Sequence, residues 1–236
     1  MSACMATSCQ PSARETAVTW NDTMQLPPAP GDSFNIGVAG AFAGICGKTL
    51  MVAGGANFPD GFPWTGAKKV WHRTLYSYDF SIEKWSVYPD FLPEPLAYGV
   101  SIPQPEGIML IGGNNADGGS RAVYMLSEKD GRPELSSDIY PELPFPLANS
   151  AGALVGTKVF LAGGICSDSV ECASHAFVML DTERKEAGWQ ILPPWPGPEL
   201  GFSVAAAAGG KFYMFGGRNF GPGKEIEIST AGFVYD

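Results

Sequence analysis

Four Gly-Gly pairs recur along this chain, and their spacing restricts the fold more than any other feature. Each pair closes a short apolar run, as in LMVAGGANFPDG, MLIGGNNADG, FLAGGICSDS and YMFGGRNFGPG. The first glycines of the pairs, Gly54, Gly112, Gly163 and Gly216, lie 58, 51 and 53 residues apart. Self-similarity at such a period indicates a chain built from successive copies of one supersecondary unit.

A second landmark recurs between the glycine pairs. The segment LYSYDFSIEKWSVYPDFLP contains Tyr-Asp, Trp and Leu-Pro in that order, and FVMLDTERKEAGWQILP repeats the order with Leu-Asp. The second unit keeps ELPFPL but has no tryptophan. Each unit is predicted to form four short strands: an inner strand of small residues, a strand ending in Gly-Gly, a strand ending in Asp and a Trp-bearing outer strand. Glycine suits the second strand's end because it accepts positive φ and lets neighbouring backbone approach closely.

These units predict an all-β fold, a kelch-type β-propeller of four-stranded antiparallel blades with about four blades' worth of chain. The composition agrees, since the 236 residues include 30 glycines and 20 prolines, many at turn positions. No apolar run approaches the roughly 18 residues that a transmembrane helix needs. The formal net charge of −9 argues against a nucleic-acid or anionic-membrane surface and leaves room only for a local cationic pocket.

The two ends of the chain carry complementary parts of one unit. The C-terminal AGFVYD stops at Tyr235-Asp236, where an outer strand should begin. Near the N-terminus, Trp20 and Leu26-Pro27 carry the outer-strand landmark with no strand before it. We therefore expect the first strand to complete a blade whose other strands come from the far end. The propeller is predicted over residues 16–236, and residues 1–15 are a leader remnant or a flexible tail.

The ordered landmarks, with GGANFPDGFPWTGAKKVWH, AYGVS and IGGNNADGGSRAVY, resemble the cyclically permuted mutarotase branch of the N-acetylneuraminate epimerase family over roughly residues 16–236. That family is known for six-bladed propellers that interconvert the anomers of sialic acid. The resemblance implies a carbohydrate isomerase acting on N-acetylneuraminate or a similar acyl sugar. The short length then implies a truncated chain, with a compact four-blade relative as the alternative. A non-catalytic kelch module that binds protein or glycan, and an inactive fragment, remain the other functional readings.

The leader MSACMATSCQPSARE has two small-residue runs that end in Cys4 and Cys9, as at bacterial lipoprotein cleavage sites, but no complete export signal precedes them. A start further upstream would predict a periplasmic or lipid-anchored envelope protein, and an unstructured tail is the alternative. Cys166 and Cys172 share one loop, where they could bridge in an oxidising compartment or remain free thiols. The sequence does not indicate an oligomeric state.

Neither a metal nor a cofactor is expected. The five cysteines show no metal-ligand spacing, and His72 and His175 are the only histidines. A zinc site would need paired Cys-x-x-Cys or clustered histidines. A copper-radical oxidase on a kelch propeller would likewise lack its ligands.

Loops after the Gly-Gly pairs and loops entering the inner strands should emerge on one face, beside the central channel. Arginine would bind the carboxylate of an acidic sugar, asparagine its hydroxyls, and an aromatic ring its apolar face. For each such residue, an ordinary polar surface, a local ion pair or a turn is the alternative. The predicted substrate contacts are Asn57, Trp64, Lys69, Arg73, Tyr98, Asn114, Asn115, Arg121, His175 and Arg218.

Anomer interconversion needs one group that removes the anomeric hydroxyl proton and one that protonates the ring oxygen. The family's proposed acid–base glutamate directly follows a glycine pair. Here the pairs are followed by Ala56, Asn114, Ile165 and Arg218, so the resemblance transfers no catalytic residue. Asp60 and Asp117 are the loop carboxylates best placed to act, with turn capping as their alternative role.

Overall fold

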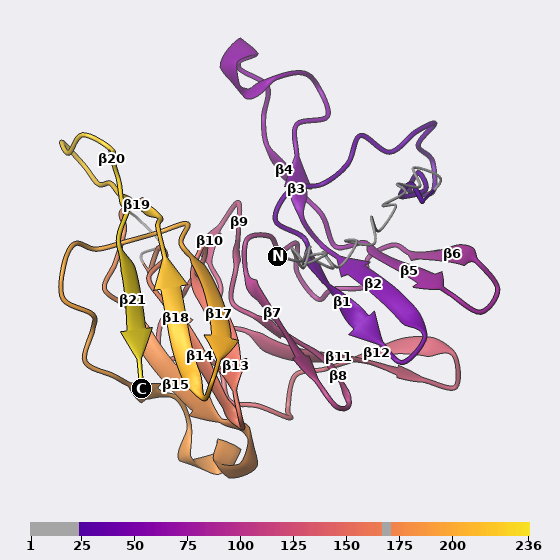
Figure 1. The fold of residues 1–236 in the computed structure, drawn as a ribbon. Helices are drawn as coiled ribbons and strands as arrows, with labels where there is room; N and C mark the ends of the chain where they lie inside the picture. Colours follow the sequence, from indigo (N-terminus) through magenta and orange to yellow (C-terminus); the bar gives the residue numbers. More distant parts are fainter. Residues whose placement is uncertain (1–23, 167–170) are drawn as a thin grey trace, which may run out of the picture.

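The structure is a computed structural model that describes residues 24–166 and 171–236. Its strands form four main antiparallel sheets (Figure 1). The first contains β1 (Phe42–Cys46), β2 (Thr49–Ala53), β5 (Leu75–Asp79) and β6 (Lys84–Tyr88). The second contains β7 (Val100–Gln104), β8 (Gly107–Ile111), β11 (Val123–Lys129) and β12 (Arg132–Ser136). The third contains β13 (Ala151–Val155), β14 (Lys158–Ala162), β15 (Phe177–Asp181) and β16 (Gln190–Ile191), and the fourth β17 (Val204–Ala208), β18 (Lys211–Phe215) and β21 (Gly232–Tyr235).

Short hairpins and turns extend from one end of these sheets. The hairpins pair β3 (Ala56–Asn57) with β4 (Val70–Trp71), β9 (Asn114–Asn115) with β10 (Gly118–Gly119), and β19 (Arg218–Asn219) with β20 (Glu227–Ile228). Two 3-10 helices, η1 (Pro63–Thr65) and η2 (Thr182–Ala187), lie in connecting loops.

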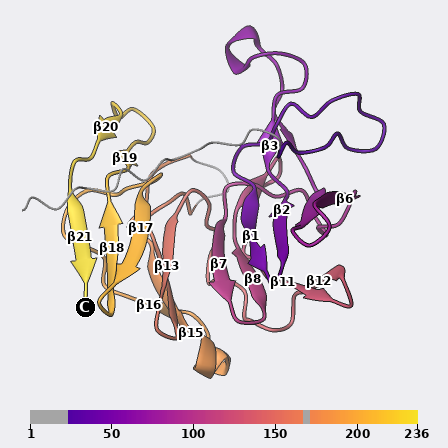
Figure 2. The same ribbon diagram turned by 45° about the vertical axis from the view of Figure 1, so that its right-hand side comes forward.

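The four sheets are the blades of a β-propeller, as the repeat predicted. Strands β1, β7, β13 and β17 contact one another in chain order, and the remaining strands of each sheet fan outward from them (Figures 1 and 2). Small residues predominate in three of these inner strands, which read FAGIC, AGALV and VAAAA. Short side chains suit this position because the inner strands of neighbouring blades lie close together.

In the first three blades a Gly-Gly pair follows the second strand, at the point where the linker to the next blade crosses the chain. In the first blade, Gly54 has φ +67, and a Cβ added there would lie 2.3 Å from the Leu96 carbonyl oxygen. The amide of Gly55 donates to the same oxygen at 2.8 Å. Leu147 and Leu200 hold equivalent positions over the second and third pairs. The glycines thus leave room for the chain that passes to the next blade.

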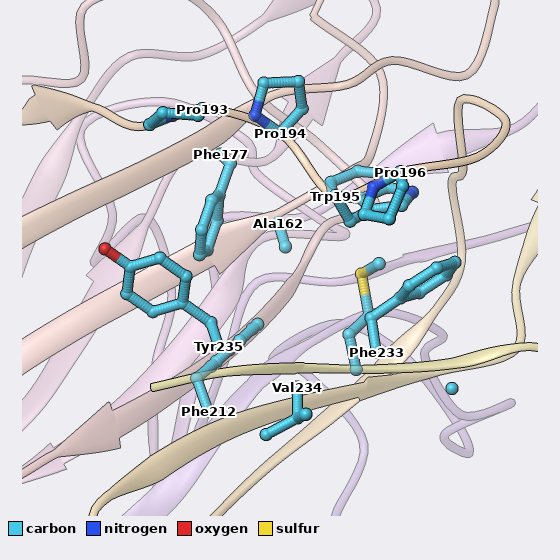
Figure 3. A pocket seen from close by; sticks show the side chains of 12 residues that line it. Ala162, Phe177, Pro193, Pro194, Trp195, Pro196, Phe212, Phe233, Val234 and Tyr235 are labelled. Carbon is cyan, nitrogen blue, oxygen red and sulfur yellow. The ribbon is translucent and has the colours of Figure 1, made fainter.

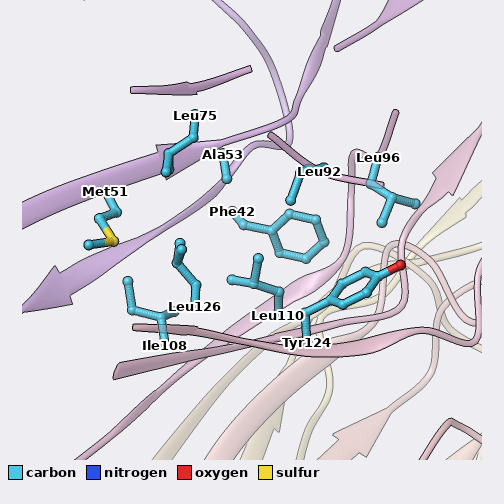
Figure 4. Packing of buried hydrophobic residues seen from close by; sticks show 10 residues of the cluster. All are labelled: Phe42, Met51, Ala53, Leu75, Leu92, Leu96, Ile108, Leu110, Tyr124 and Leu126. Carbon is cyan, nitrogen blue, oxygen red and sulfur yellow. The ribbon is translucent and has the colours of Figure 1, made fainter. Parts of the chain in front are cut away.

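The hydrophobic core lies between adjacent blades. One cluster joins the first and second sheets through Phe42, Met51 and Leu75 on one side and Ile108 and Leu110 on the other (Figure 4). The leucine of the Leu-Pro landmark belongs to this layer, because Leu92 and Leu143 have no exposed surface. Burial of one such leucine contributes roughly 2 kcal/mol.

The outer strands differ in part from the expectation. Trp85 lies in β6, as predicted, and the second blade forms β12 without a tryptophan. In the third blade the outer strand is only Gln190–Ile191, so Trp189 precedes it; its indole Nε1 donates to the Pro141 carbonyl at 3.0 Å. The tryptophan there supports the neighbouring linker and contributes no residue to a strand.

The fourth blade has three strands within the described part of the chain. The expected closing strand near Trp20 lies outside the described residues, and its continuation, Leu26–Pro28, is not in a strand. Instead, Asn35 Nδ2 donates to the Pro27 carbonyl at 2.9 Å and to the Tyr76 hydroxyl at 3.1 Å, which holds this segment against the first blade. Val204 and Phe215, which pair with each other across β17 and β18 of the fourth sheet, are exposed.

Three of the five cysteines lie in the described part of the chain. Cys4 and Cys9 of the leader lie outside the described residues. Cys166 and Cys172 are free thiols, as is Cys46. Between residues 24 and 166 and from 171 onward, the structure has no helix long and apolar enough to span a membrane.

Candidate functional site

Four equivalent backbone positions run in an open row along the loop face, from the first blade to the fourth. Gly40, Tyr98, Asn149 and Phe202 each lie two residues before the inner strand of their blade, and all four have positive φ, between 53° and 64°. Backbone N–H groups link them in succession: Tyr98 to Gly40 at 2.7 Å, Asn149 to Tyr98 at 2.8 Å and Phe202 to Asn149 at 2.9 Å. We call these four residues the axial ring, which is open, because no hydrogen bond joins Phe202 to Gly40 in the described chain. Three non-glycine residues in this strained region are unusual, and such strain concentrates at functional sites.

The loops predicted to share this face do so. Isolated bridges join Ala39 with Ala56 and Ala97 with Asn114, which places each entering loop beside the loop that follows the glycine pair of the same blade. Gly201 and Arg218 make the same bridge in the fourth blade. The repeated topology, applied blade by blade, thus brings the two sets of loops together around the axial ring.

Lys69 lies over aromatic rings at one end of the axial ring. Its ammonium nitrogen is 5.0 Å from the ring centroid of Tyr98, 5.3 Å from that of Trp71 and 5.8 Å from that of Phe58. None of the ion pairs found among the described residues includes Lys69. A cavity of about 610 Å³ lies alongside, lined by Asn57, Phe58 and Tyr98 among others. Its volume is within the usual range for small-molecule sites.

Arg218 lies over aromatic rings at the other end of the axial ring. Its guanidinium carbon is 4.0 Å from the ring centroid of Phe202 and 5.1 Å from that of Phe220. The Nε atom is buried and has no hydrogen-bond partner in the described chain, and the same holds for Oδ1 of the adjacent Asn219. Two unpaired cations stacked on aromatic rings, Lys69 and Arg218, therefore flank Asn149.

The predicted asparagines are held by neighbouring side chains. Asn114 Oδ1 accepts from the Trp71 indole at 3.1 Å, and Asn115 Nδ2 donates to a Glu94 carboxylate oxygen at 3.2 Å. The other Glu94 oxygen accepts from the Ser120 hydroxyl at 3.1 Å. Neither asparagine has positive φ. Glu94, a half-buried carboxylate beside these loops, was not selected from the sequence, although its Leu-Pro-Glu-Pro context marks it as part of a linker.

Asn57 turns toward a polar cavity of about 220 Å³ behind the β3–β4 hairpin. Its Oδ1 accepts from His72 Nε2 at 2.8 Å and its Nδ2 donates to the Gly37 carbonyl at 2.9 Å. Burial lowers the pKa of His72, and the negative charge of Asp32 opposes that shift. A neutral His72 therefore fixes the segment before β1 against the first blade, with Asn57 as the link.

Three of the residues predicted to contact substrate occupy equivalent positions in the first three blades, and each contacts the linker that leads to the next blade. Arg73 Nε donates to the Leu92 carbonyl and Arg121 Nε to the Leu143 carbonyl, both at 2.7 Å. His175 Nε2 lies 2.8 Å from the Gly197 carbonyl oxygen. The two arginines also face acids, Asp90 at 3.9 Å and Glu142 at 3.6 Å. Each of the three lies six residues before the end of its blade's third-strand landmark, at Asp79, Ser127 or Asp181, and makes the same contact, which holds the linker over its blade.

The other predicted residues are exposed. Asp60 and Asp117 lie in turns, and the Asp117 backbone N–H donates to Asn115 Oδ1 at 2.8 Å. Trp64 belongs to η1 in the loop between β3 and β4, which projects beyond the sheets (Figure 1), and its side chain is 78% exposed. It stacks on Phe62 with centroids 4.8 Å apart.

A separate apolar cavity of about 440 Å³ lies between the third and fourth blades (Figure 3). Prolines 193, 194 and 196 cover it together with Trp195, while Phe233 and Tyr235 come from β21. Tyr235 is its only ionisable lining residue. This cavity offers hydrophobic contact and no set of polar groups that could bind a sugar acid.

Metal ligation finds no support among the residues that the structure describes. No group of three or more His, Cys, Asp or Glu side chains there could hold a metal ion.

The sheets and the axial ring define a β-propeller with a ligand-sized cavity on its loop face. A sequence model of the N-acetylneuraminate epimerase family matches residues 5–133, more than half of the chain. This chain belongs to the N-acetylneuraminate epimerase family.

The alignments of this chain with relatives in that family cover only part of each relative's length. The N-acetylneuraminate epimerase of Brucella melitensis biotype 1 is 36% identical over 128 residues, which is 50% of this chain and 32% of that protein. The protein of the same name from Yersinia pestis, strain Pestoides F, is 38% identical over 123 residues, 48% of this chain and 31% of that protein. The one from Salmonella arizonae is 40% identical over 110 residues, 43% of this chain and 28% of that protein. The alignments thus span less than a third of each relative.

A solved structure of YjhT resembles this chain with a TM-score of 0.68. The likeness covers 84% of this chain and 68% of YjhT at 16% sequence identity. At that identity the likeness concerns the fold, and it agrees with the arrangement of the four blades.

Proposed function

We propose that this chain is a carbohydrate isomerase that interconverts the anomers of N-acetylneuraminate or a similar acyl sugar. Membership of the N-acetylneuraminate epimerase family supports the reaction class. The observation that supports a site is that two cations lie over rings of the axial residues, Lys69 over Tyr98 and Arg218 over Phe202, in a protein whose formal net charge is −9. Neither cation forms an ion pair in the described chain, and Tyr98 and Phe58 beneath Lys69 also line a cavity of about 610 Å³; both features suit an anionic sugar.

The chemistry requires proton transfer at two oxygens. One group takes the proton of the anomeric hydroxyl while another protonates the ring oxygen, and the opened keto form closes on its other face. Asp60 and Asp117 remain the proposed carboxylates, each in a turn of a loop that follows a glycine pair. Tyr98 and Phe58 would cover the apolar face of the sugar.

Proton NMR of freshly dissolved crystalline N-acetylneuraminate tests the proposal, because one anomer predominates at first and the approach to equilibrium can be followed directly. The chain should shorten the equilibration time at constant pH, and heat-denatured protein should not. An unchanged equilibration time with protein shown to be folded by circular dichroism would contradict the proposal.

A binding module is the second candidate, favoured by one observation. Phe62 and Trp64 stack on each other at the projecting β3–β4 loop and are 60% and 78% exposed. Paired aromatic rings of this kind serve as contact points for protein or glycan partners. Glycan-array binding that is lost in Trp64→Ala, together with unchanged sugar equilibration, would favour this function.

A further inference from the structure

Arg218 differs from the other arginines of the loop face in its partners. Arg73 and Arg121 each use Nε on a linker carbonyl and face a carboxylate. Arg218 has neither contact: its Nε has no partner, and none of the ion pairs in the described chain includes it. Glu227 pairs with Asn219 across the β19–β20 hairpin and forms no ion pair with Arg218.

The aromatic contacts hold the guanidinium in a defined orientation. Phe202 lies 4.0 Å from its carbon and Phe220 5.1 Å, and the two rings contact each other with centroids 5.7 Å apart. Stacking occupies the face of a guanidinium and leaves its N–H groups pointing outward in its plane. Phe202 is itself fixed, because its backbone N–H donates to Asn149 within the axial ring. The terminal nitrogens are therefore presented at a constrained position beside the ring.

An unpaired, half-buried arginine in an acidic protein indicates that a further group completes the site. Nearly all buried polar groups in folded proteins have hydrogen-bond partners, and here two adjacent residues, Arg218 and Asn219, each have a buried atom without one. A planar carboxylate matches the in-plane N–H groups of arginine in a bidentate pair. Lys69, the other unpaired cation, is a point charge surrounded by three aromatic rings and lacks this geometry.

We propose that Arg218 binds the carboxylate of the ligand and so sets the preference of this site for acidic over neutral sugars. This inference rests on the proposed function for the choice of N-acetylneuraminate as ligand. Phe202 and Phe220 act as positioning residues that hold the guanidinium. The sugar ring then extends from Arg218 over Asn149 toward Tyr98 and Lys69.

Isothermal titration calorimetry with two ligands and three proteins tests this assignment. The ligands are N-acetylneuraminate and its methyl ester, in which esterification removes the carboxylate charge and adds one methyl group. The proteins are the unaltered chain, Arg218→Gln and the control Arg132→Gln, which removes an exposed arginine from β12. The unaltered chain and the control should bind the acid roughly ten-fold or more tightly than the ester, as expected for a charge-assisted pair. Arg218→Gln should bind both ligands equally.

Several results would overturn the assignment. One such result is that Arg218→Gln retains the preference for the acid. Another is that Arg218→Gln lowers the affinity for both ligands by the same factor, which would place Arg218 on a sugar hydroxyl. Failure of the unaltered chain to bind the acid at millimolar concentration would also overturn it. The proposed isomerase activity is judged separately by the NMR equilibration rate. Tight binding of the acid that depends on Arg218, without faster anomer equilibration, would refute the isomerase activity and support the carboxylate site. Faster equilibration, with a preference for the acid that Arg218→Gln retains, would support the activity and refute the carboxylate site.

Discussion

Asn149 donates its backbone N–H to the carbonyl of Tyr98 at 2.8 Å, and both residues have positive φ, 53° and 62°. This bond joins the inner edges of the second and third blades at the centre of the loop face. The same bond recurs between Tyr98 and Gly40 and between Phe202 and Asn149. The axial ring thus connects the blades where the proposed ligand would lie.

The first prediction concerns the conformation of Asn149. Asn149→Val should reduce the free energy of unfolding by roughly 1–3 kcal/mol, because a β-branched residue is strained at positive φ. Asn149→Gly should cost much less, because glycine adopts positive φ readily. Urea denaturation followed by tryptophan fluorescence measures both. Equal stability of the two variants would show that the left-handed conformation is not a constraint.

The second prediction concerns the crossing of linker and glycine pair. In Gly54→Ala the added Cβ would lie 2.3 Å from the Leu96 carbonyl oxygen, and the bond from Gly55 to that oxygen would be disturbed. We expect a loss of roughly 3 kcal/mol or more, which combines strain and a displaced linker. Gly47→Ala is the matched control: its φ is +58 and nothing lies within 4 Å of the added atom. Both are compared by urea denaturation, and a similar loss in the two would refute the steric explanation.

The third prediction concerns Arg121 as a structural residue. Arg121→Gln should lower the free energy of unfolding by about 1–2 kcal/mol, because the Leu143 carbonyl loses a charged donor at 2.7 Å. Arg132→Gln, on the exposed side of β12, should remain within about 0.5 kcal/mol of the unaltered chain. Thermal or urea unfolding provides the comparison. A loss of sugar affinity with unchanged stability would instead assign Arg121 to the ligand site.

The fourth prediction concerns pH. Burial lowers the pKa of His72 from its ordinary value of 6.5, so the unfolded chain binds a proton more readily than the folded one. The stability contributed by neutral His72 is therefore complete above pH 6.5 and is lost as the pH falls through the pKa of the folded protein. In His72→Gln, whose amide can still donate to Asn57, this loss should be absent. Urea denaturation from pH 7.5 to 5 measures the difference between the two proteins, and a constant difference would contradict the prediction.

The sequence predicted where the candidate site residues lie but not the contacts that their side chains make. That loop residues gather beside the axis followed from topology, whereas the aromatic contacts of Lys69 and Arg218 depend on how the loops fold, and the ligand role of both residues stays a prediction. Arg73, Arg121 and His175 were predicted to contact the ligand and each lie six residues before an equivalent position, Asp79, Ser127 or Asp181, yet all three contact linkers. Equal spacing in a repeat identifies equivalent positions, and the contacts of the side chain decide what those positions do.

The sequence by itself determined the repeat, the strand that each glycine pair follows and the small residues of the inner strands, because these depend on local sterics and on the alternation of apolar and turn residues. Only the tertiary structure decided which side chains remain without partners. Whether an arginine such as Arg218 is free or bound to a carbonyl depends on chain segments from other strands and neighbouring linkers. Distances between such segments arise when the blades pack against one another, and sequence spacing does not contain them.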